Sequence, residues 1–197
     1  GEQSFQVGRG AVLASKLPES VRAVTIDRQC GSSQQSIQFA TQAVLSGTQD
    51  VVIAAGVESM TRVPMGSTGM LFAQAGLGKA KSPKQEERFP GVQFSQFMGA
   101  EMMAKKHGFS KEELDRYSLE SHRRAAAATQ AGAFDDEVVP LTIETPEGEE
   151  RHRTDEGIRH DATLEGIASV KLLAEGGVIT AANASQICDG ASGVLIV

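Results

Sequence analysis

Cysteine is scarce in this sequence, and long hydrophobic runs are missing. Only two of the 197 residues are cysteines, Cys30 and Cys188, which is too few for a disulfide framework, and their separation does not match the spacing of zinc ligands. The longest apolar runs, Val51–Val57 and Val194–Val197, are far shorter than the roughly 20 residues that cross a bilayer. We therefore expect a reducing compartment, no bound metal and no membrane span.

Basic residues are also in the minority. The sequence has 19 lysines and arginines against 25 acidic residues, a net charge of −6, which disfavours nonspecific binding to nucleic acid. Hydrophobic residues make up 40% and charged residues 22%, a balance typical of a globular protein and not of a disordered chain. At about 100–200 residues per domain, the length allows one large domain or two small ones.

The N-terminal part of the chain has the alternating pattern of an α/β fold. We expect a helix over residues 5–15, a strand over Val21–Ile26, a helix over Ser32–Ser46 and a strand over Val51–Ala55. The last of these is an unbroken apolar run, which is typical of a strand buried on both faces. Gly47 suits the position just past a helix end. A strand, a helix and a buried strand in this order predict a βαβ unit.

The middle of the chain has a different character. Residues 61–99 show no lasting periodicity, and Gly76–Pro90 has the composition of a loop. Ser110 and Glu113 then fit a capping box at the start of a helix. The other predicted elements are a helix over Met98–His107, the capped helix to Gly132, an edge strand over Val138–Ile143, a turn over 147–150, and β structure over Val178–Thr180 and Ala191–Val197.

Cys30 lies in the predicted turn between a strand and a helix. Such a sharp connection holds a side chain exposed above the sheet, as in a nucleophile elbow. A helix N-terminus also adds partial positive charge, which favours a thiolate. Gly31 lets the backbone approach a substrate closely. A small buried cysteine is an equally good interpretation of this position alone. Cys188 is predicted to be a packing residue, and the four histidines to be surface or helix residues without metal-ligand spacing.

Several segments together resemble the thiolases, the acyl-CoA:acetyl-CoA C-acyltransferases. The first is Cys30-Gly31-Ser32 with the glutamine-rich helix after it, and the second is Asp50–Met65 with its Gly-Val-Glu-Ser-Met core. The third, Val178–Ala191, is similar to the family's Thr-Ala-Gly-Asn-Ala-Ser and Asp-Gly-Ala segment, with alanine in place of the first glycine. Phe97–Glu101 and Asp155–Arg159 match intervening segments. The resemblance covers nearly all of the sequence, in family order.

The resemblance implies roles for five residues. Cys30 is the residue that takes the acyl group from an acyl-CoA. Arg159 and Ser185 match positions that contact coenzyme A, Arg159 near its phosphate-bearing end. Ala181 lines the same pocket, and Met98 matches a position near the thioester. Taken singly, such residues are ordinarily a solvated arginine, turn residues and a core methionine, so only their joint occurrence favours function.

The resemblance also implies the fold and domain organisation. It predicts an α/β, thiolase-like layered fold with a partial N-terminal domain over 1–60, an inserted α+β loop domain that covers coenzyme A over 61–176, and a return to the N-terminal domain over 177–197. The family's Gly-His-Pro segment, whose His activates the first thiol, does not occur in the sequence. The triplet Cys188-Asp189-Gly190 has the letters of the family's Cys-x-Gly segment, whose Cys is the second base, but it lies where the family does not place a catalytic cysteine. We expect a central fragment without the first strand and helix or the C-terminal half, inactive on its own.

The expected function is acyl transfer between coenzyme A thioesters through an acyl-Cys30 intermediate. The reaction is thiolysis of a 3-ketoacyl-CoA or the reverse condensation with acetyl-CoA, with coenzyme A as substrate or product and no other cofactor. Phe97 stands where short-chain biosynthetic members often carry His, which favours a degradative enzyme with a bulkier acyl group. The alternatives are a ketoacyl-synthase-type condensing enzyme and a noncatalytic acyl-CoA-binding or assembly protein.

The resemblance implies partners as well. We expect a homodimer or homotetramer in which Val21–Ile26 is an edge strand that pairs with its mate across the dimer. The expected location is the cytoplasm if the protein is bacterial. A mitochondrial or peroxisomal location is the alternative, because a targeting segment would precede Gly1.

Overall fold

A computed structural model describes residues 6–78 and 81–197. Phe5, which the first predicted helix included, and the polar stretch Gly1–Ser4 lie outside the described residues. Helices, an antiparallel strand pair and a separate hairpin make up an α/β protein. Within the described residues, no helix is both long and apolar enough to span a membrane.

The chain forms two compact units. Unit 1 contains Gly1–Arg88 and Ile187–Val197, and unit 2 contains Phe89–Gln186. The family segments expected at 1–60, 61–176 and 177–197 are a different division of the chain, and they stay a prediction.

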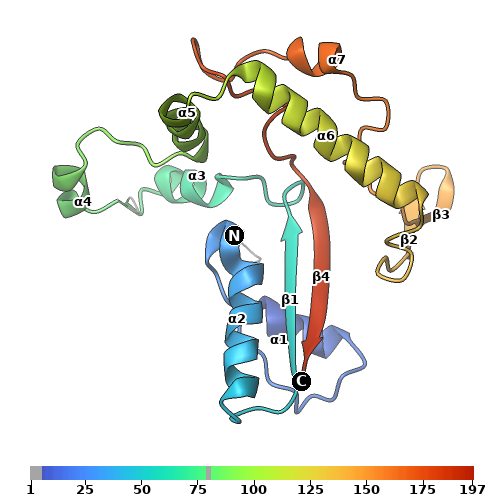
Figure 1. Cartoon of the computed structure of the whole chain (residues 1–197). Helices are drawn as coiled ribbons and strands as arrows, with labels where there is room; N and C mark the ends of the chain where they lie inside the picture. The colour runs from blue at the N-terminus through green and yellow to red at the C-terminus, as the bar shows by residue number, and fades with distance from the viewer. Residues whose placement is uncertain (1–5, 79–80) are drawn as a thin grey trace. The chain divides into compact units, whose positions relative to one another are not determined.

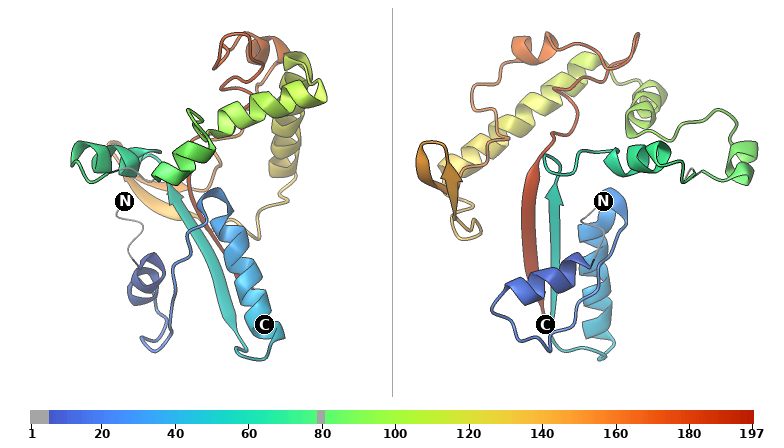
Figure 2. Two further views of the ribbon diagram at one scale, coloured as in Figure 1. Left: turned by 90° about the vertical axis from the view of Figure 1, so that its left-hand side faces the viewer. Right: turned by 180° about the vertical axis from the view of Figure 1, so that it is seen from behind.

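An antiparallel strand pair with one helix along it forms the centre of unit 1. The strands β1 (Val52–Ser59) and β4 (Asp189–Ile196) run side by side in every view, with α2 (Ser32–Leu45) beside them (Figures 1 and 2). Their register runs from Val52 opposite Ile196 to Ser59 opposite Asp189. The other elements of unit 1 are α1 (Val7–Ala14), the 3₁₀ helix η2 (Gln29–Gly31), α3 (Ser67–Gln74) and α4 (Pro83–Arg88).

Glycine allows α2 to lie close to β1. A Cβ atom added at Gly56 would come within 2.1 Å of the Ser33 hydroxyl oxygen, far inside any normal contact. Gly47, just past α2, has a φ of 70°, the left-handed conformation that glycine adopts most readily. The helix predicted over Ser32–Ser46 and its glycine terminator are therefore confirmed, and they fix where the first turn of α2 stands.

The predicted βαβ unit lacks its first strand. Val21–Ile26 pairs with no strand in the described part of the chain, because its neighbour is a helix. Arg9 of α1 donates to the Val21 carbonyl at 2.8 Å, and a Cβ atom added at Gly8 would lie 3.3 Å from the Ala23 Cβ. The expectation that the strand at 51–55 is buried on both faces is wrong too. Of the residues of β1, all of them described, only Ala54 is buried, because pairing with β4 covers an edge of the strand and not its faces.

Unit 2 is built around a long capped helix. Its elements are α5 (Gln96–His107), α6 (Lys111–Gln130), β2 (Leu141–Thr145), β3 (Gly148–His152) and α7 (Leu164–Ala168). The helix α6 packs against α7, and β2 and β3 form an antiparallel hairpin. The predicted capping box is confirmed, and α5 begins slightly before its predicted start.

Three local expectations need correction. The region 61–99 contains α3 and α4, although it lacks lasting periodicity. Pro83 fits the first turn of α4, and the Ser82 hydroxyl accepts a hydrogen bond from the Gln85 amide, so local capping starts this helix. The strand predicted over 138–143 begins instead after Pro140, which has no N–H to donate. The predicted turn at 147–150 runs into β3.

Candidate functional site

Cys30 lies in a turn that hydrogen bonds hold in place directly before α2. The Gln29 amide donates to the Asp27 carboxylate at 2.9 Å, and the Arg28 amide donates to the Ser32 hydroxyl at 2.8 Å. The same hydroxyl donates to the Gln29 carbonyl at 2.6 Å. Each flank of Cys30 is thus fixed to the start of the helix.

The backbone of this turn is strained. Gln29 has a φ of 49°, in the left-handed region that residues other than glycine seldom adopt. Such conformations cost about 1–3 kcal/mol and persist where surrounding contacts determine them. One such contact joins the Arg28 guanidinium to the Gln35 side chain at 2.7 Å, one helical turn into α2. The strain and its compensation lie beside the predicted nucleophile.

Both thiols of the chain are exposed. For Cys30, this exposure does not fit the alternative of a buried structural cysteine. For Cys188, it contradicts the prediction of a packing role. Cys188 stands directly before β4, a strand that carries mostly exposed residues, so no interior was available to receive its side chain.

A second candidate site is a pocket of about 280 Å³ within unit 2. Arg159 and Ala181, two of the residues predicted to contact coenzyme A, both line it. Ser185 lies between the lining residues Ala184 and Gln186, but it is not itself a lining residue. Met98 lies on α5, is 53% exposed and does not line this pocket. The lining residues are His122, Arg159, Ala162, Ile167, Val170, Ala181, Ala182, Ala184 and Gln186.

The Arg159 loop is anchored from two sides. The Arg159 amide donates to Nδ1 of His122 at 3.2 Å, which leaves the proton of a neutral imidazole on Nε2. The Gln186 side chain donates to the Gly157 carbonyl at 2.6 Å, and an added Cβ at Gly157 would lie 2.7 Å from the Gln186 oxygen. His122, predicted to be a surface or helix residue, therefore helps to form the pocket.

A carboxylate from α5 supports the segment that leads into the pocket. Glu101 accepts hydrogen bonds from the amides of Val178 and Ile179, at 2.9–3.0 Å. An added Cβ at Gly177 would lie 2.2 Å from its Oε1, so a side chain there would displace the Glu101 carboxylate from these hydrogen bonds. The sequence pattern showed Glu101 only as part of the matching segment Phe97–Glu101 and gave no sign of this contact.

The two segments that meet in the strand pair of unit 1 are fastened at one end. Thr61 donates its hydroxyl and its backbone N–H to the Asp189 carboxylate, the latter at 3.0 Å. These hydrogen bonds, the hydroxyl first, hold the pKa of Asp189 below its usual value. Two of the segments that carry the family resemblance, 50–65 and 178–191, are joined here.

Comparison with known proteins agrees with this arrangement. A family model described as "Thiolase, N-terminal domain" matches residues 1–197. The chain is 46% identical over 198 residues to the steroid 3-ketoacyl-CoA thiolase FadA6 of Mycobacterium tuberculosis, a match that covers 100% of this chain and 47% of that protein. It is 37% identical over 198 residues to the 3-ketoacyl-CoA thiolase of Aliivibrio fischeri, covering 99% and 49%.

The fold agrees as well. The crystal structure of human mitochondrial 3-ketoacyl-CoA thiolase matches with a TM-score of 0.81 and 31% identity, over 99% of this chain and 50% of that one. The chain belongs to the thiolase family, and the family and fold predicted from its segments are confirmed. It spans about half the length of the relatives it matches.

Proposed function

We propose that this chain takes part in acyl transfer between coenzyme A thioesters through an acyl-Cys30 intermediate. The observation that carries the proposal is the exposed thiol in a hydrogen-bonded turn at the start of α2, in a chain of the thiolase family. The names of the two bacterial relatives support a 3-ketoacyl-CoA as the substrate class.

The proposed reaction has two steps. The Cys30 thiolate attacks the keto carbonyl carbon of a 3-ketoacyl-CoA. The bond from that carbon to the CH₂ carbon next to the thioester then breaks. The released carbanion takes a proton and becomes acetyl-CoA. The sulfur of free coenzyme A, having given up its proton, then attacks the acyl-Cys30 carbonyl. An acyl-CoA shortened by an acetyl unit leaves, and the Cys30 thiolate is restored. Condensation is the same sequence reversed.

Backbone amides at the start of α2 are suited to stabilise the negative charge on the attacked carbonyl oxygen. The proton transfers need further groups. The sequence contains no Gly-His-Pro segment, and its Cys188-Asp189-Gly190 triplet belongs to the segment that resembles the family's Asp-Gly-Ala stretch, so we assign the activating histidine and the second base to residues outside these 197.

We propose that the unit 2 pocket takes part of coenzyme A, which is substrate or product and the only cofactor required. Arg159, Ala181 and Ser185 are the assigned contacts there, and Met98 is assigned to the thioester end. Arg159→Ala should raise the KM for coenzyme A substrates roughly tenfold, because a hydrogen bond to a charged group contributes about 1.5–3 kcal/mol. Arg116→Ala, which removes an exposed ion pair on α6, is the matched control. An unchanged KM in Arg159→Ala would contradict the assignment.

The proposed acyl group of the substrate and the proposed direction of the reaction rest on Phe97 and on one relative. An aromatic side chain at 97, and 46% identity to a protein named a steroid 3-ketoacyl-CoA thiolase, support degradation of a bulky acyl group. Comparing kcat/KM for short, long and polycyclic 3-ketoacyl-CoA thioesters tests this. A preference for acetoacetyl-CoA would contradict it.

We also propose a homo-oligomer, a dimer or tetramer, in the cytoplasm if the protein is bacterial. The support is the segment Val21–Ile26, which is rich in β-branched residues and pairs with no strand in the described part of this chain. Such a segment is available to pair with its mate in a second copy. Sedimentation of the full-length protein at tens of micromolar should show an oligomer, and a monomer would oppose the proposal.

The main test is the acyl adduct. We expect intact-mass spectrometry of the full-length protein after incubation with acetyl-CoA to show one acetyl group, lost in Cys30→Ala and kept in Cys188→Ala. Binding of acetyl-CoA without an adduct would favour the noncatalytic alternative. Residues 1–197 alone should acylate slowly and not turn over acetoacetyl-CoA, because a missing general base typically costs about 10²–10⁴-fold.

A further inference from the structure

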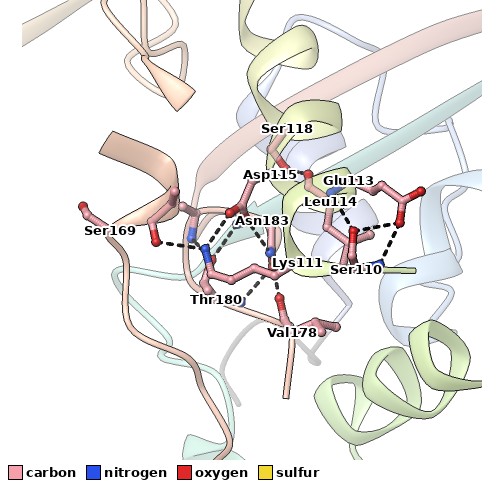
Figure 3. Close-up of polar contacts among 12 residues, drawn as sticks. Ser110, Lys111, Glu113, Leu114, Asp115, Ser118, Ser169, Val178, Thr180 and Asn183 are labelled. Carbon is pink, nitrogen blue, oxygen red and sulfur yellow. Dashed lines mark hydrogen bonds and ion pairs between the residues drawn. The ribbon is translucent and has the colours of Figure 1, made fainter. Parts of the chain in front are cut away.

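One face of α6 carries a buried carboxylate that the proposed reaction does not use. Asp115 is only 1% exposed. Its Oδ2 pairs with the Lys111 ammonium group, and its Oδ1 accepts a hydrogen bond from the Asn183 side-chain amide at 3.0 Å (Figure 3). A buried carboxylate with both oxygens engaged is costly to bury and holds its partners in fixed positions.

Asn183 passes this constraint to the turn around it. Its side-chain nitrogen also donates to the Val178 carbonyl at 3.0 Å, and its side-chain oxygen accepts from the Thr180 amide at 2.8 Å. The Thr180 hydroxyl, fully buried, accepts from the amides of Ala182 and Asn183 at 3.1 and 3.2 Å. Both hydrogens of the Asn183 side-chain amide are engaged, one within the turn and one by Asp115, so Asp115 connects this turn to α6.

The oriented turn is one wall of the pocket. Ala181, Ala182 and Ala184 all line the pocket, and they stand beside or between the bonded residues 180 and 183. Small side chains leave the backbone itself close to the space, so a displaced turn changes the shape of the pocket directly.

The same helix also holds the other walls. The Lys111 ammonium group donates to the Ala168 carbonyl at 3.0 Å, at the end of α7, next to the lining residues Ile167 and Val170. Two helical turns after Asp115, His122 accepts the Arg159 amide. Lys111, Asp115 and His122 thus connect α6 to three separate segments that surround one space.

We propose that Asp115 is a positioning residue for ligand binding: through Asn183 it holds the 180–184 wall in the shape that accepts coenzyme A. The proposal rests on the proposed function, because that function assigns coenzyme A to this pocket. Asp115 itself touches no ligand.

The experiment measures the Kd of coenzyme A by isothermal titration calorimetry on the full-length protein, well below each variant's melting temperature. Asp115→Ala should weaken binding roughly tenfold, because it leaves one hydrogen of the Asn183 side-chain amide unpaired and releases the wall from α6. Asp115→Asn keeps an acceptor oxygen for Asn183 and should restore Kd to within about threefold of the unaltered protein. Glu112→Ala is the matched control, since Glu112 makes an exposed ion pair on the same helix, and it should not change Kd.

The alkylation rate of Cys30 separates positioning from general loss of structure. It should be equal in all variants, since Cys30 belongs to unit 1. A folded Asp115→Ala variant with unaltered Kd would overturn the proposal. If Asp115→Ala does not fold, Asn183→Ala breaks the same contact from the other side, and an unaltered Kd there would overturn the proposal as well. If the unaltered protein binds no coenzyme A, the proposed function fails and this proposal fails with it.

Discussion

The helices α2 and α6 begin in opposite ways. At α6, the Ser110 hydroxyl accepts the Glu113 amide at 3.2 Å, and the Glu113 carboxylate accepts the Ser110 amide at 2.8 Å. At α2, the N-cap residue is Gly31, and no described side chain caps the helix. One helix start is closed by a capping box. The other has no side-chain cap and follows the 3₁₀ turn η2, whose carbonyls accept the Gly31 and Ser32 amides beside an exposed thiol.

The difference teaches what each start is for. A capping box stabilises a helix by satisfying amides that the helix leaves unpaired. Leaving those amides uncapped gives up that stabilisation but keeps partial positive charge available to an anion. In unit 1 the turn before α2 instead carries the strained Gln29. The start of α6 is thus the better stabilised of the two, and the start of α2 is the one that the proposed function uses.

The largest effect expected from this contrast is thiol selectivity. With a limiting amount of iodoacetamide at pH 6.5, Cys30 should carry nearly all of the label, because Cys30 lies directly before the N-terminus of α2 and Cys188 lies directly before a strand. Peptide mapping of the full-length protein measures the ratio. Equal labelling of Cys30 and Cys188 would end the comparison.

Placing a charge at the open helix start should remove its advantage. Gly31→Asp puts a carboxylate beside Cys30, where it disfavours a second negative charge, so alkylation of Cys30 should slow about tenfold. The substitution fits the space, since an added Cβ would lie 3.8 Å from the Arg28 side chain. Gly31→Asn has nearly the same shape without the charge and should react at close to the original rate. Equal rates for Asp and Asn would show that charge is not the cause.

Opening the closed helix start should cost stability and not reactivity. Ser110→Ala removes the cap of α6 and should lower the free energy of unfolding by about 1 kcal/mol. Urea denaturation measures this, with Ser118→Ala as control, because Ser118 bonds a carbonyl within the same helix. The rate of Cys30 alkylation should stay unchanged. A stability loss no larger than that of the control would argue against the cap.

The smallest effect expected is a dependence of folding stability on pH. Hydrogen bonds from the Ser110 amide and then from its hydroxyl lower the pKa of Glu113 below its ordinary 4.5. Because the folded pKa is the lower one, this contribution to stability is complete above about pH 5 and is lost as the pH falls through the folded pKa. Between pH 6 and pH 3.5 the urea midpoint should fall more in the unaltered protein than in Glu113→Gln, which keeps the cap without the titration. Parallel curves would be inconsistent with this assignment.

Much of the fold was predictable where the signal is local. The capping residues of α6 and the glycine after α2 act within one helical turn, so the sequence displays them directly. The element at 21–26 was predicted from β-branched residues, yet a strand also needs a hydrogen-bonded partner, and β propensity does not supply one. The helix α4 is short and was hidden by its polar composition.

The sites divide along the same line. The order of the family segments in the sequence predicted that Arg159 and Ala181 line one pocket, and both do. Cys30 was predicted to precede a helix, and it lies directly before α2. His122 and Asp115 were missed because their partners stand far away in sequence, at Arg159 and Asn183. The only advance sign was spacing: Lys111 and Asp115 stand four positions apart on a helix, which allows an ion pair but does not indicate burial.

The pairing of β1 with β4 also orders events during synthesis. Residues 52–59 leave the ribosome early, but their partners at 189–196 follow only after the whole of unit 2 has been made. Unit 2 is continuous in sequence, so its contacts can all form before β4 appears. Until then β1 lacks this neighbour, and joining it closes a very long loop, a step that slows folding. Nascent unit 1 is therefore more in need of protection from aggregation than unit 2 until β4 arrives.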